Sequence, residues 1–130
     1  MDVGKLIYNI LVNDATVTGI VNTRIFPGFV PQDTQFPALT YAFDSQLPSK
    51  TKDGGSKLDV LDLSIVIYHE DYTQAQALAD RCRALLDYYA ATAQGVTVDK
   101  ITFDNQTDNS YVSQYEFVVL TQSYNVRLRR

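Results

Sequence analysis

The fold is decided by residues 58–91, LDVLDLSIVIYHEDYTQAQALADRCRALLDYYAA, where one hydrophobic periodicity replaces another. From Leu58 to Tyr68 the pattern alternates and predicts a strand, whose apolar face holds Leu61, Leu63, Ile65 and Ile67. From about Thr73 to Ala91 the spacing becomes three to four residues and predicts a long amphipathic helix, with the stripe Ala75, Leu78, Cys82, Leu85 and Tyr89. Thr73 and Gln76 have capping-box spacing, which places the helix start at Thr73. A strand that runs straight into a helix indicates helices packed on a sheet.

Upstream of this stretch the chain shows the same two periodicities. Residues 3–11 have helical spacing, with Asp2 available as N-cap, and Asp14 can cap a second, shorter helix that ends near residue 22. Arg24–Pro31 is too rich in proline and glycine for a helix, so we expect a short edge strand there. Alternation returns at Pro37–Asp44, which predicts a strand with Leu39, Tyr41 and Phe43 on one face.

Between the strands Pro37–Asp44 and Leu58–Tyr68 lies a segment without a core pattern. Residues 46–57 contain three lysines and two adjacent glycines, and no apolar residue follows Pro48. Such a segment cannot pack, so we expect a mobile β-hairpin arm. Because the arm is also basic, its candidate partner-docking residues are Lys50, Lys52, Gly54, Gly55 and Lys57.

Downstream of the long helix, Gly95 can end the connection to two further alternating segments, Val96–Phe103 and Tyr111–Val126. The polar residues Asp104–Ser110 between them predict a turn and hence a hairpin. The last strand has apolar residues on both faces, so it is either central in a covered sheet or exposed at an interface. The element order predicts an α+β fold, a mostly antiparallel sheet with two main helices packed on it and a long β-hairpin arm.

Length and charge narrow the class of protein. The chain has 130 residues, 45% of them hydrophobic, which is the size of a single domain, 1–130. No apolar run is long enough to span a membrane and no secretory signal is recognisable, so we expect a protein made in the cytoplasm that does not enter membranes. The formal net charge of −4 argues against binding to nucleic acid. Two small basic features, Lys50–Lys57 and Arg127–Arg130, stand against an otherwise acidic body and suit contacts with other proteins.

The search for chemistry gives no candidate catalytic, metal-binding or cofactor-binding residue. His69 is the single histidine and lies beside Glu70 and Asp71, where a surface residue at a turn is expected. Cys82 lies on the apolar stripe of the long helix and is expected to act as a small hydrophobic residue. Asp104 and Asp108 resemble part of a calcium loop, but the glycine and glutamate that such a loop needs are missing. We therefore expect a protein that is not an enzyme and that works through its surfaces.

At the level of longer motifs the chain resembles a known family. The residues that carry the resemblance are Leu11–Val21, Thr23-Arg24-Ile25-Phe26-Pro27, Val30-Pro31-Gln32 and Phe36-Pro37-Ala38-Leu39, followed by Ile65–Tyr68, Asp71-Tyr72 and Tyr115–Val119. This succession is similar to the tail terminator proteins of long-tailed bacteriophages, also called tail completion or tail-to-head joining proteins. The resemblance covers nearly the whole chain.

The resemblance implies a structural virion protein that forms a hexameric ring at the head-proximal end of a tail tube. Such a ring ends tube polymerisation and joins the tail to the head. Its implied partners are further copies of itself, the tail tube protein and the head–tail connector, or stopper, while DNA passes through the pore without specific binding. For subunit contacts the candidates are Arg24, Phe26, Phe29, Tyr115 and Phe117, because they combine exposed backbone with aromatic side chains and sheet edges pair readily.

Two alternatives remain open from the sequence. One is a monomeric or dimeric α+β ligand-binding domain in which the arm acts as a lid. The other is a different neck component, such as the stopper beneath the portal. The sequence does not reveal the host, the tail length, the neighbouring proteins or the face that meets the tube.

Overall fold

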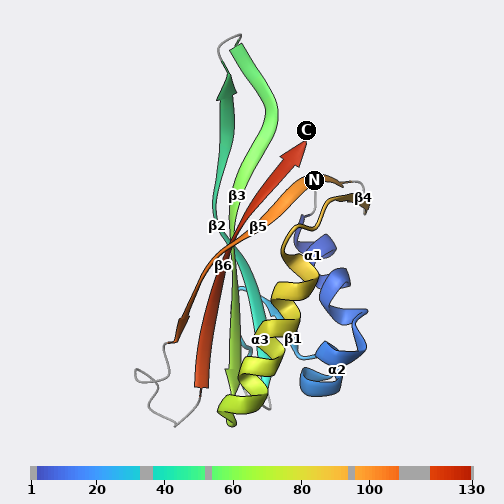
Figure 1. The fold of residues 1–130 in the computed structure, drawn as a ribbon, viewed down its shortest axis with the longest axis vertical. Coiled ribbons are helices and arrows are strands. Elements are labelled where there is room, and N and C mark those ends of the chain that lie inside the picture. The colour runs from blue at the N-terminus through green and yellow to red at the C-terminus, as the bar shows by residue number, and fades with distance from the viewer. Residues whose placement is uncertain (1–2, 33–36, 52–53, 94–95, 109–117, 130) are drawn as a thin grey trace.

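The computed structural model describes residues 3–32, 37–51, 54–93, 96–108 and 118–129, which form a six-stranded sheet and three helices (Figure 1). The elements are α1 (Val3–Val12), α2 (Ala15–Val21), β1 (Ile25–Pro27), β2 (Ala38–Thr51), β3 (Gly54–His69), α3 (Tyr72–Leu86), β4 (Ala91–Ala93), β5 (Val96–Asp108) and β6 (Val118–Arg129). The strands lie in the order β1-β2-β3-β6-β5-β4, and only the pair β1 and β2 is parallel. The predicted α+β class is confirmed.

The predicted arm is the outer half of a long hairpin. β2 and β3 pair from Ala38 and Tyr68 out to Thr51 and Gly54, with register shifts on the way. β6 pairs with β3 only from Leu58 onward, so the earlier part of β3 has β2 alone as its neighbour in the described sheet. The hairpin therefore projects beyond the other strands (Figure 1).

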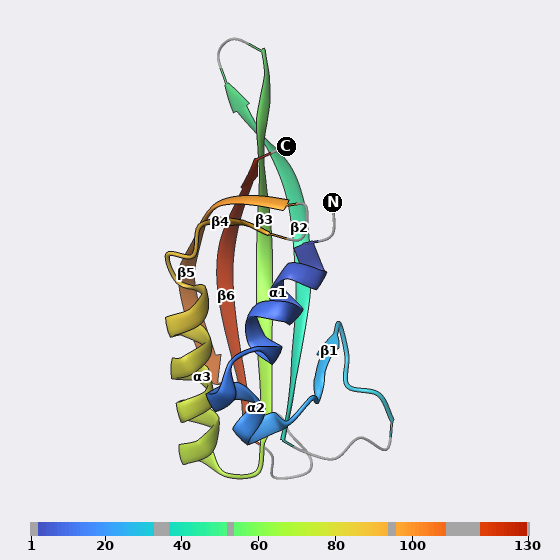
Figure 2. The same ribbon diagram turned by 90° about the vertical axis from the view of Figure 1, so that its right-hand side faces the viewer.

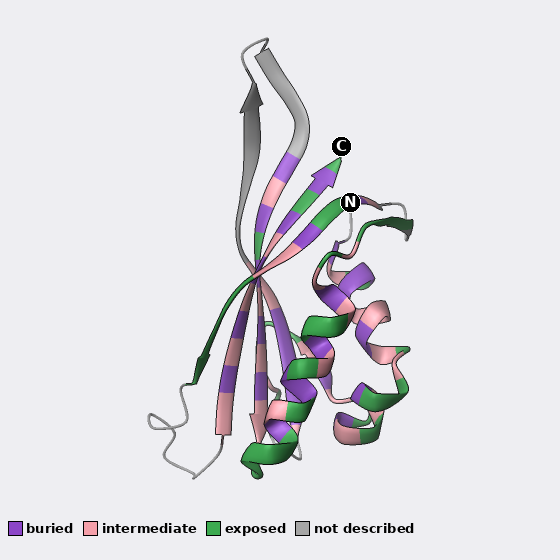
Figure 3. Ribbon diagram, in the orientation of Figure 1, coloured by how far each residue is buried: buried purple, intermediate pink, exposed green. Residues whose placement is uncertain are grey.

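Alternate residues of the central strands build the core against the helices, which lie on one face of the sheet (Figures 2 and 3). Leu61, Leu63, Ile65 and Ile67 of β3 are all buried, as predicted, and so are Leu120, Tyr124, Val126 and Leu128 of β6. The helices contribute Leu6, Ile7 and Leu11, then Val17 and Val21, then Leu78, Ala79, Cys82 and Leu86. The hydrophobic periodicity thus identified the core face of β3 and most of that of α3. In α3 the predicted Leu85 is only half-buried while Leu86 is fully buried, and Tyr89 lies beyond the helix.

A polar network lies within this core and fixes α3 on the sheet. The Gln122 side chain is fully buried, and its Nε2 donates to the carbonyl oxygen of Ala79 at 2.9 Å and to Gln106 Oε1 at 3.1 Å. Its Oε1 accepts a 2.7 Å hydrogen bond from the Tyr124 hydroxyl. Because buried polar groups are costly when unpaired, these bonds favour one position of α3 over β5 and β6.

Both ends of the long helix differ from the prediction. The N-cap is Asp71, whose Oδ1 accepts from the backbone N–H of Thr73, so α3 begins at Tyr72 and the capping box at Thr73 is wrong. The helix ends at Leu86 and not near Ala91, because Asp87 leaves the helical conformation and its Oδ1 accepts the backbone N–H of Phe103. At the start of the shorter helix α2, the predicted cap Asp14 is confirmed, whereas Asp2 lies outside the described residues.

Both C-terminal strands end later in the chain than predicted, and residues 111–117 of the predicted last strand lie outside the described residues. Asp104–Asp108 was expected to turn, but these residues continue β5 and pair with β6 as far as Leu120. Backbone pairing with β6, and not the burial of apolar side chains, keeps this polar segment extended. β6 likewise continues past Val126 to Arg129, and the short strand β4 was not predicted. Of the two positions foreseen for the last strand, β6 occupies the central one, between β3 and β5.

Candidate functional site

One edge of the sheet carries an open apolar groove of about 860 Å³, between the start of α1, the turn after β1 and the middle of β2. Its walls include the aromatic side chains of Tyr8, Phe29, Tyr41 and Phe43, and Lys5 also lines it. Phe29 stands out from this wall with 72% of its side chain exposed. Hydrophobic and aromatic walls with few polar groups are typical of surfaces that receive a partner.

The groove forms because β1 separates from β2 after three residues. Gly28 has a φ of +80°, which favours glycine, and its N–H donates to the carbonyl oxygen of Tyr41 at 2.8 Å. Phe29 then turns away, with its N–H bonded to the carbonyl oxygen of Pro27. Beyond Tyr41 no strand pairs with the outer edge of β2 within the residues that the structure describes. An unpaired strand edge is a template for pairing with another chain.

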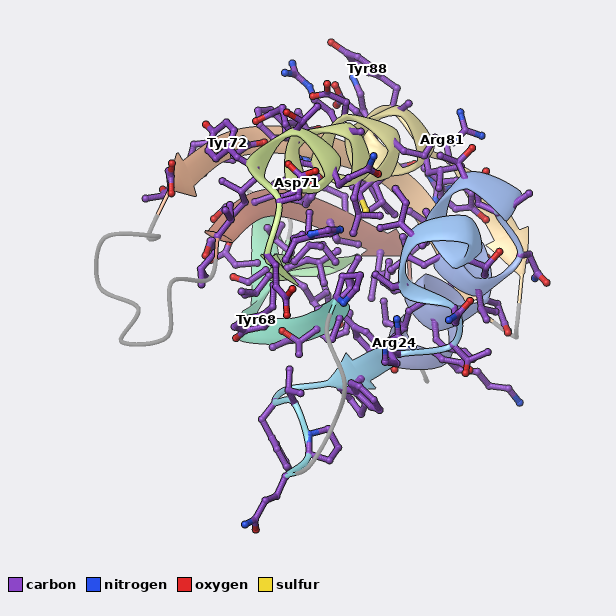
Figure 4. All side chains as sticks on the ribbon, turned by 90° about the horizontal axis from the view of Figure 1, so that it is seen from below. Arg24, Tyr68, Asp71, Tyr72, Arg81 and Tyr88 are labelled. Atoms are coloured by element: carbon purple, nitrogen blue, oxygen red, sulfur yellow. The ribbon has the colours of Figure 1, made fainter. Side chains whose placement is uncertain are left out.

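At the opposite edge of the sheet the chain between α3 and β4 presents Tyr88, which is 71% exposed. Tyr88 has a φ of +66°, a region that bulky side chains rarely adopt. Its N–H donates to the carbonyl oxygen of Ile101 at 2.7 Å, and the Ile101 N–H donates to Tyr89 at 2.9 Å. The Lys100 ammonium lies 5.1 Å from the centre of the Tyr88 ring. Figure 4 shows Tyr88 and Arg24 on opposite sides of the molecule.

The two ends of the sheet differ in charge. Arg129 pairs across to Leu58 and Thr97, so the basic C-terminal strand end lies beside the base of the arm. Lys100 and Arg127 are cross-strand partners at the same end, and both are exposed. Arg129 is paired there with the carboxylate of Asp99 at 3.2 Å. The other end of the sheet, with the start of α3, carries the exposed acids Glu70, Asp71, Asp104 and Asp108. Two basic features that are far apart in the sequence therefore come together at one end.

The predicted contact residues fall into three groups. Arg24 is half-buried, and its Nε donates to the carbonyl oxygen of Pro37 at 2.7 Å, which ties the start of β1 to the start of β2. Phe26 is half-buried in β1, and Phe29 is exposed beside the groove. Tyr115 and Phe117 lie outside the described residues. β1 is the outermost strand of the described sheet, whereas both edges of the described part of β6 are paired. The contact role of all five residues stays a prediction.

The arm residues are placed only by their backbone. Lys50 lies opposite Gly55 and Thr51 opposite Gly54, while Lys57 lies in β3 one residue before the pairing with β6 begins. Lys52 falls outside the described residues. The docking role of the arm stays a prediction.

Sequence reasoning missed the exposed tyrosines and the groove. Tyr88 was included in the predicted helix, and the strained backbone that turns its ring outward depends on tertiary contacts with Ile101. Asp87 carried a usable signal, because a short polar residue after an apolar stripe can end a helix by bonding to backbone groups. Nothing in the pattern of α1 showed that Lys5 and Tyr8 face a groove.

The ion pair between Arg81 and Asp14 stabilises the arrangement of two helices. Arg81 binds Asp14 with two nitrogens, at 2.6 Å from Nη2 and about 3 Å from Nε. This hydrogen bonding holds the pKa of Asp14 below its ordinary value of 3.8, against the opposing effect of burial. The pair joins the N-terminus of α2 to α3 and so fixes the two helices relative to each other.

His69 and Cys82, the residues considered for catalysis, have contacts that stabilise the fold. His69 Nδ1 accepts the backbone N–H of Asp71 at 2.9 Å, in the turn between β3 and α3. Cys82 is fully buried, and burial raises the pKa of its thiol to about 12. Among the described residues no group of three His, Cys, Asp or Glu side chains could hold a metal ion, and no helix there is long and apolar enough to cross a membrane.

Comparison with known proteins identifies relatives of this fold. A family model described as Tail completion protein gp17 matches residues 5–121. No curated protein sequence matches the chain. Among solved structures, a chain of the virion of a native gene transfer agent (GTA) particle has a TM-score of 0.80 and 15% sequence identity, over 95% of this chain and 92% of that chain. At 15% sequence identity, this structural similarity shows only that the two chains share a fold.

Proposed function

Because the chain belongs to the Tail completion protein gp17 family, we propose that it forms a ring at the head-proximal end of a phage tail tube, ends tube polymerisation and joins the tail to the head. The observation that carries this proposal is the family match over residues 5–121. The ring is a homohexamer within the virion, and its subunits are made in the host cytoplasm. Its outer partners are the tail tube protein and the head–tail connector, or stopper.

The surface of the molecule supports a role between two different partners. A ring at the junction of tail and head has one face toward the tube and one toward the connector, so its two faces need different chemistry. The described residues place the exposed Lys100 and Arg127 at one end, where Arg129 is paired with Asp99, and the exposed acids Asp71 and Asp108 at the other end. Complementary charge gives such contacts specificity and fixes their orientation.

DNA passes through the pore of the ring without binding specifically. The net charge of −4 repels phosphate groups over the molecule as a whole, which keeps the duplex moving. Basic groups are limited in number and serve protein contacts in this proposal.

The arm is assigned to docking on the tube or on a neighbouring protein. Its hairpin projects beyond the sheet, and Lys50, Lys52 and Lys57 give it a positive charge. Deletion of residues 50–57 should therefore reduce the yield of infectious tails. Substitution of the three lysines by glutamine keeps the length of the arm and removes its positive charge, so it tests the charge alone. Unchanged tail assembly in the deletion would refute this role of the arm.

Removal of the whole chain from the assembling phage tests the main proposal. Tails that end at irregular lengths and remain unjoined to heads are expected in electron micrographs, together with restored joining when the chain is supplied from a plasmid. Normal, joined tails without the chain, or its absence from purified tails, would refute the proposal. A stopper would instead leave tails of normal length that lack heads.

A further inference from the structure

The outer edge of β2, which faces away from β3, is open over most of its length. β1 pairs with β2 only from Leu39 to Tyr41, whereas β2 continues to Thr51 with no second neighbour in the described part of the chain. An open strand edge can hydrogen-bond to the same edge of another molecule, and soluble proteins carry features that prevent such pairing. β2 has two features of this kind, which are register shifts and a proline.

Two register shifts divide this open edge into short pieces. In the pairing of β2 with β3, one shift lies between Phe43 and Ser45, and the other lies between Pro48 and Lys50. Regular pairing between the two shifts covers residues 45–48 alone. Irregularities of this kind bend and twist a strand, so an approaching strand finds only a short regular stretch with which to pair.

The register also shows which residues of β2 direct their backbone groups to the open edge. Leu39 through its N–H, and Tyr41 through its carbonyl oxygen, bond to the segment Arg24–Gly28, so both face outward. Along antiparallel strands this direction alternates from one residue to the next, and residues opposite each other face either both toward or both away from the partner strand. The β3 partners of Leu39 and Tyr41 are Ile67 and Ile65. Every second residue of β3, counted back from Ile67, therefore marks an outward-facing residue of β2.

Pro48 is one of these outward-facing residues. Its partner Asp59 lies eight positions before Ile67 in β3, which pairs without a skipped residue between them, and Gln46 faces outward in the same way opposite Leu61. Proline has no N–H, and it is tolerated within a sheet where the missing donor would face away from the neighbouring strand. A strand that approached the open edge would thus find no donor at Pro48.

We propose that Pro48 keeps the outer edge of β2 from pairing with a second copy of this chain. A second copy is the relevant partner because two identical open edges can pair with each other about a two-fold axis. Such an isologous contact gives a dimer and does not close into a larger ring. Pro48 therefore prevents the free subunit from dimerising through its sheet. This inference does not depend on the ring proposed above.

Restoring the missing donor tests the inference on the purified full chain. Pro48→Ala introduces an N–H with a small side chain, and Pro48→Thr does so with a residue that favours strands. Sedimentation velocity should detect dimers of both variants, with an association constant raised about fivefold or more by the new backbone hydrogen bonds. Hydrogen exchange measured by mass spectrometry should show protection of residues 42–49 that increases with protein concentration. Pro31→Ala is the matched control, because Pro31 is exposed and lies outside every helix and strand.

A second variant tests whether the direction of the missing donor is the cause. Gln46→Pro combined with Pro48→Ala returns a proline to the same outward-facing row, so the dimers should disappear. Dimers that persist in this folded double variant would overturn the inference. Pro48 variants that associate no more than wild type would also overturn it, as would association without added protection of residues 42–49. Concentration-dependent protection of this segment in the wild-type chain would show that the edge already pairs and would refute the block.

These outcomes are separate from those for the proposed ring. Dimers of the Pro48 variants differ in mass from a hexamer, and wild-type rings in which residues 42–49 stay unprotected are compatible with both proposals. Absence of a ring in wild-type tails would remove the proposed function and leave the role of Pro48 standing.

Discussion

Replacement of Tyr124 by phenylalanine tests whether the buried polar network fixes α3 on the sheet. Tyr124 is 1% exposed, and burial raises the pKa of its hydroxyl, which therefore stays protonated and donates to Gln122 Oε1. The substitution removes this donor and leaves the amide oxygen of Gln122 buried without it. An unsatisfied buried acceptor costs about 1–3 kcal/mol of unfolding free energy.

The complementary substitution is Gln122→Leu, which removes the acceptor and leaves the Tyr124 hydroxyl buried without it. Ala79 and Gln106 lose less, because the carbonyl oxygen of Ala79 lies within a helix and Gln106 is exposed to water. We expect this single variant also to lose about 1–3 kcal/mol of unfolding free energy. In the double variant neither group is left without its partner, so the total loss should fall short of the sum by about 1 kcal/mol or more.

The assay is urea unfolding followed by far-ultraviolet circular dichroism, with thermal melts as a second measure. From an unfolding entropy of about 2.1 cal/mol/K per residue, each kcal/mol lowers the Tm of this chain by about 4 °C. Tyr72→Phe is the matched control, because it removes a hydroxyl from an exposed tyrosine and should change stability by less than about 0.5 kcal/mol. Additive effects of the two core substitutions would refute the argument.

Three further predictions concern single residues. Asp14→Asn should destabilise the protein at neutral pH. Because the pKa of Asp14 is lowered in the folded state, its contribution is fully present above its ordinary pKa and is lost as the pH falls through the lowered pKa of the folded protein, so the stabilities of wild type and variant should converge in acid unfolding curves. Cys82 should react with iodoacetamide only after unfolding, because it is buried and its pKa is raised to about 12, and mass spectrometry of the native protein should find it unmodified. Tyr88→Gly should be more stable than Tyr88→Ala by about 1 kcal/mol in urea, because only glycine adopts the positive φ without strain; equal stability of the two would show that the conformation is not imposed by the fold.

Prediction from sequence succeeded where residues repeat a pattern over several turns or strand positions. The alternation in β3 and the stripe of α3 identified the core face of β3 and most of that of α3, because burial of one face follows directly from the period of the backbone. It failed at element ends. Asp71, Asp87 and the residues Asp104–Asp108 have no apolar pattern. Asp71 caps α3 through the nearby Thr73, whereas the conformations of Asp87 and Asp104–Asp108 depend on a hydrogen bond to the distant Phe103 and on pairing with β6.

Among the candidate contact residues, too, some could be chosen from the sequence and others could not. The exposure of Phe29 follows from the proline and glycine beside it, which keep this short segment from joining a regular strand. Tyr115 and Phe117 were chosen by sequence alone and stay predictions. Tyr88 could not be chosen, because its outward position depends on hydrogen bonds to Ile101 across the edge of β5.

The amino-acid sequence by itself determined the α+β class, the core faces, the long hairpin arm and the resemblance to tail completion proteins, since periodicity and motif order are local properties of a chain. Only the tertiary structure decided that β6 lies in the middle of the sheet, that the basic arm and the basic C-terminal strand share one end, and that Phe29 and Tyr88 lie at opposite edges. These arrangements depend on which strands pair. Pairing is a choice among distant partners, and it is made by the total burial and hydrogen bonding of the whole sheet.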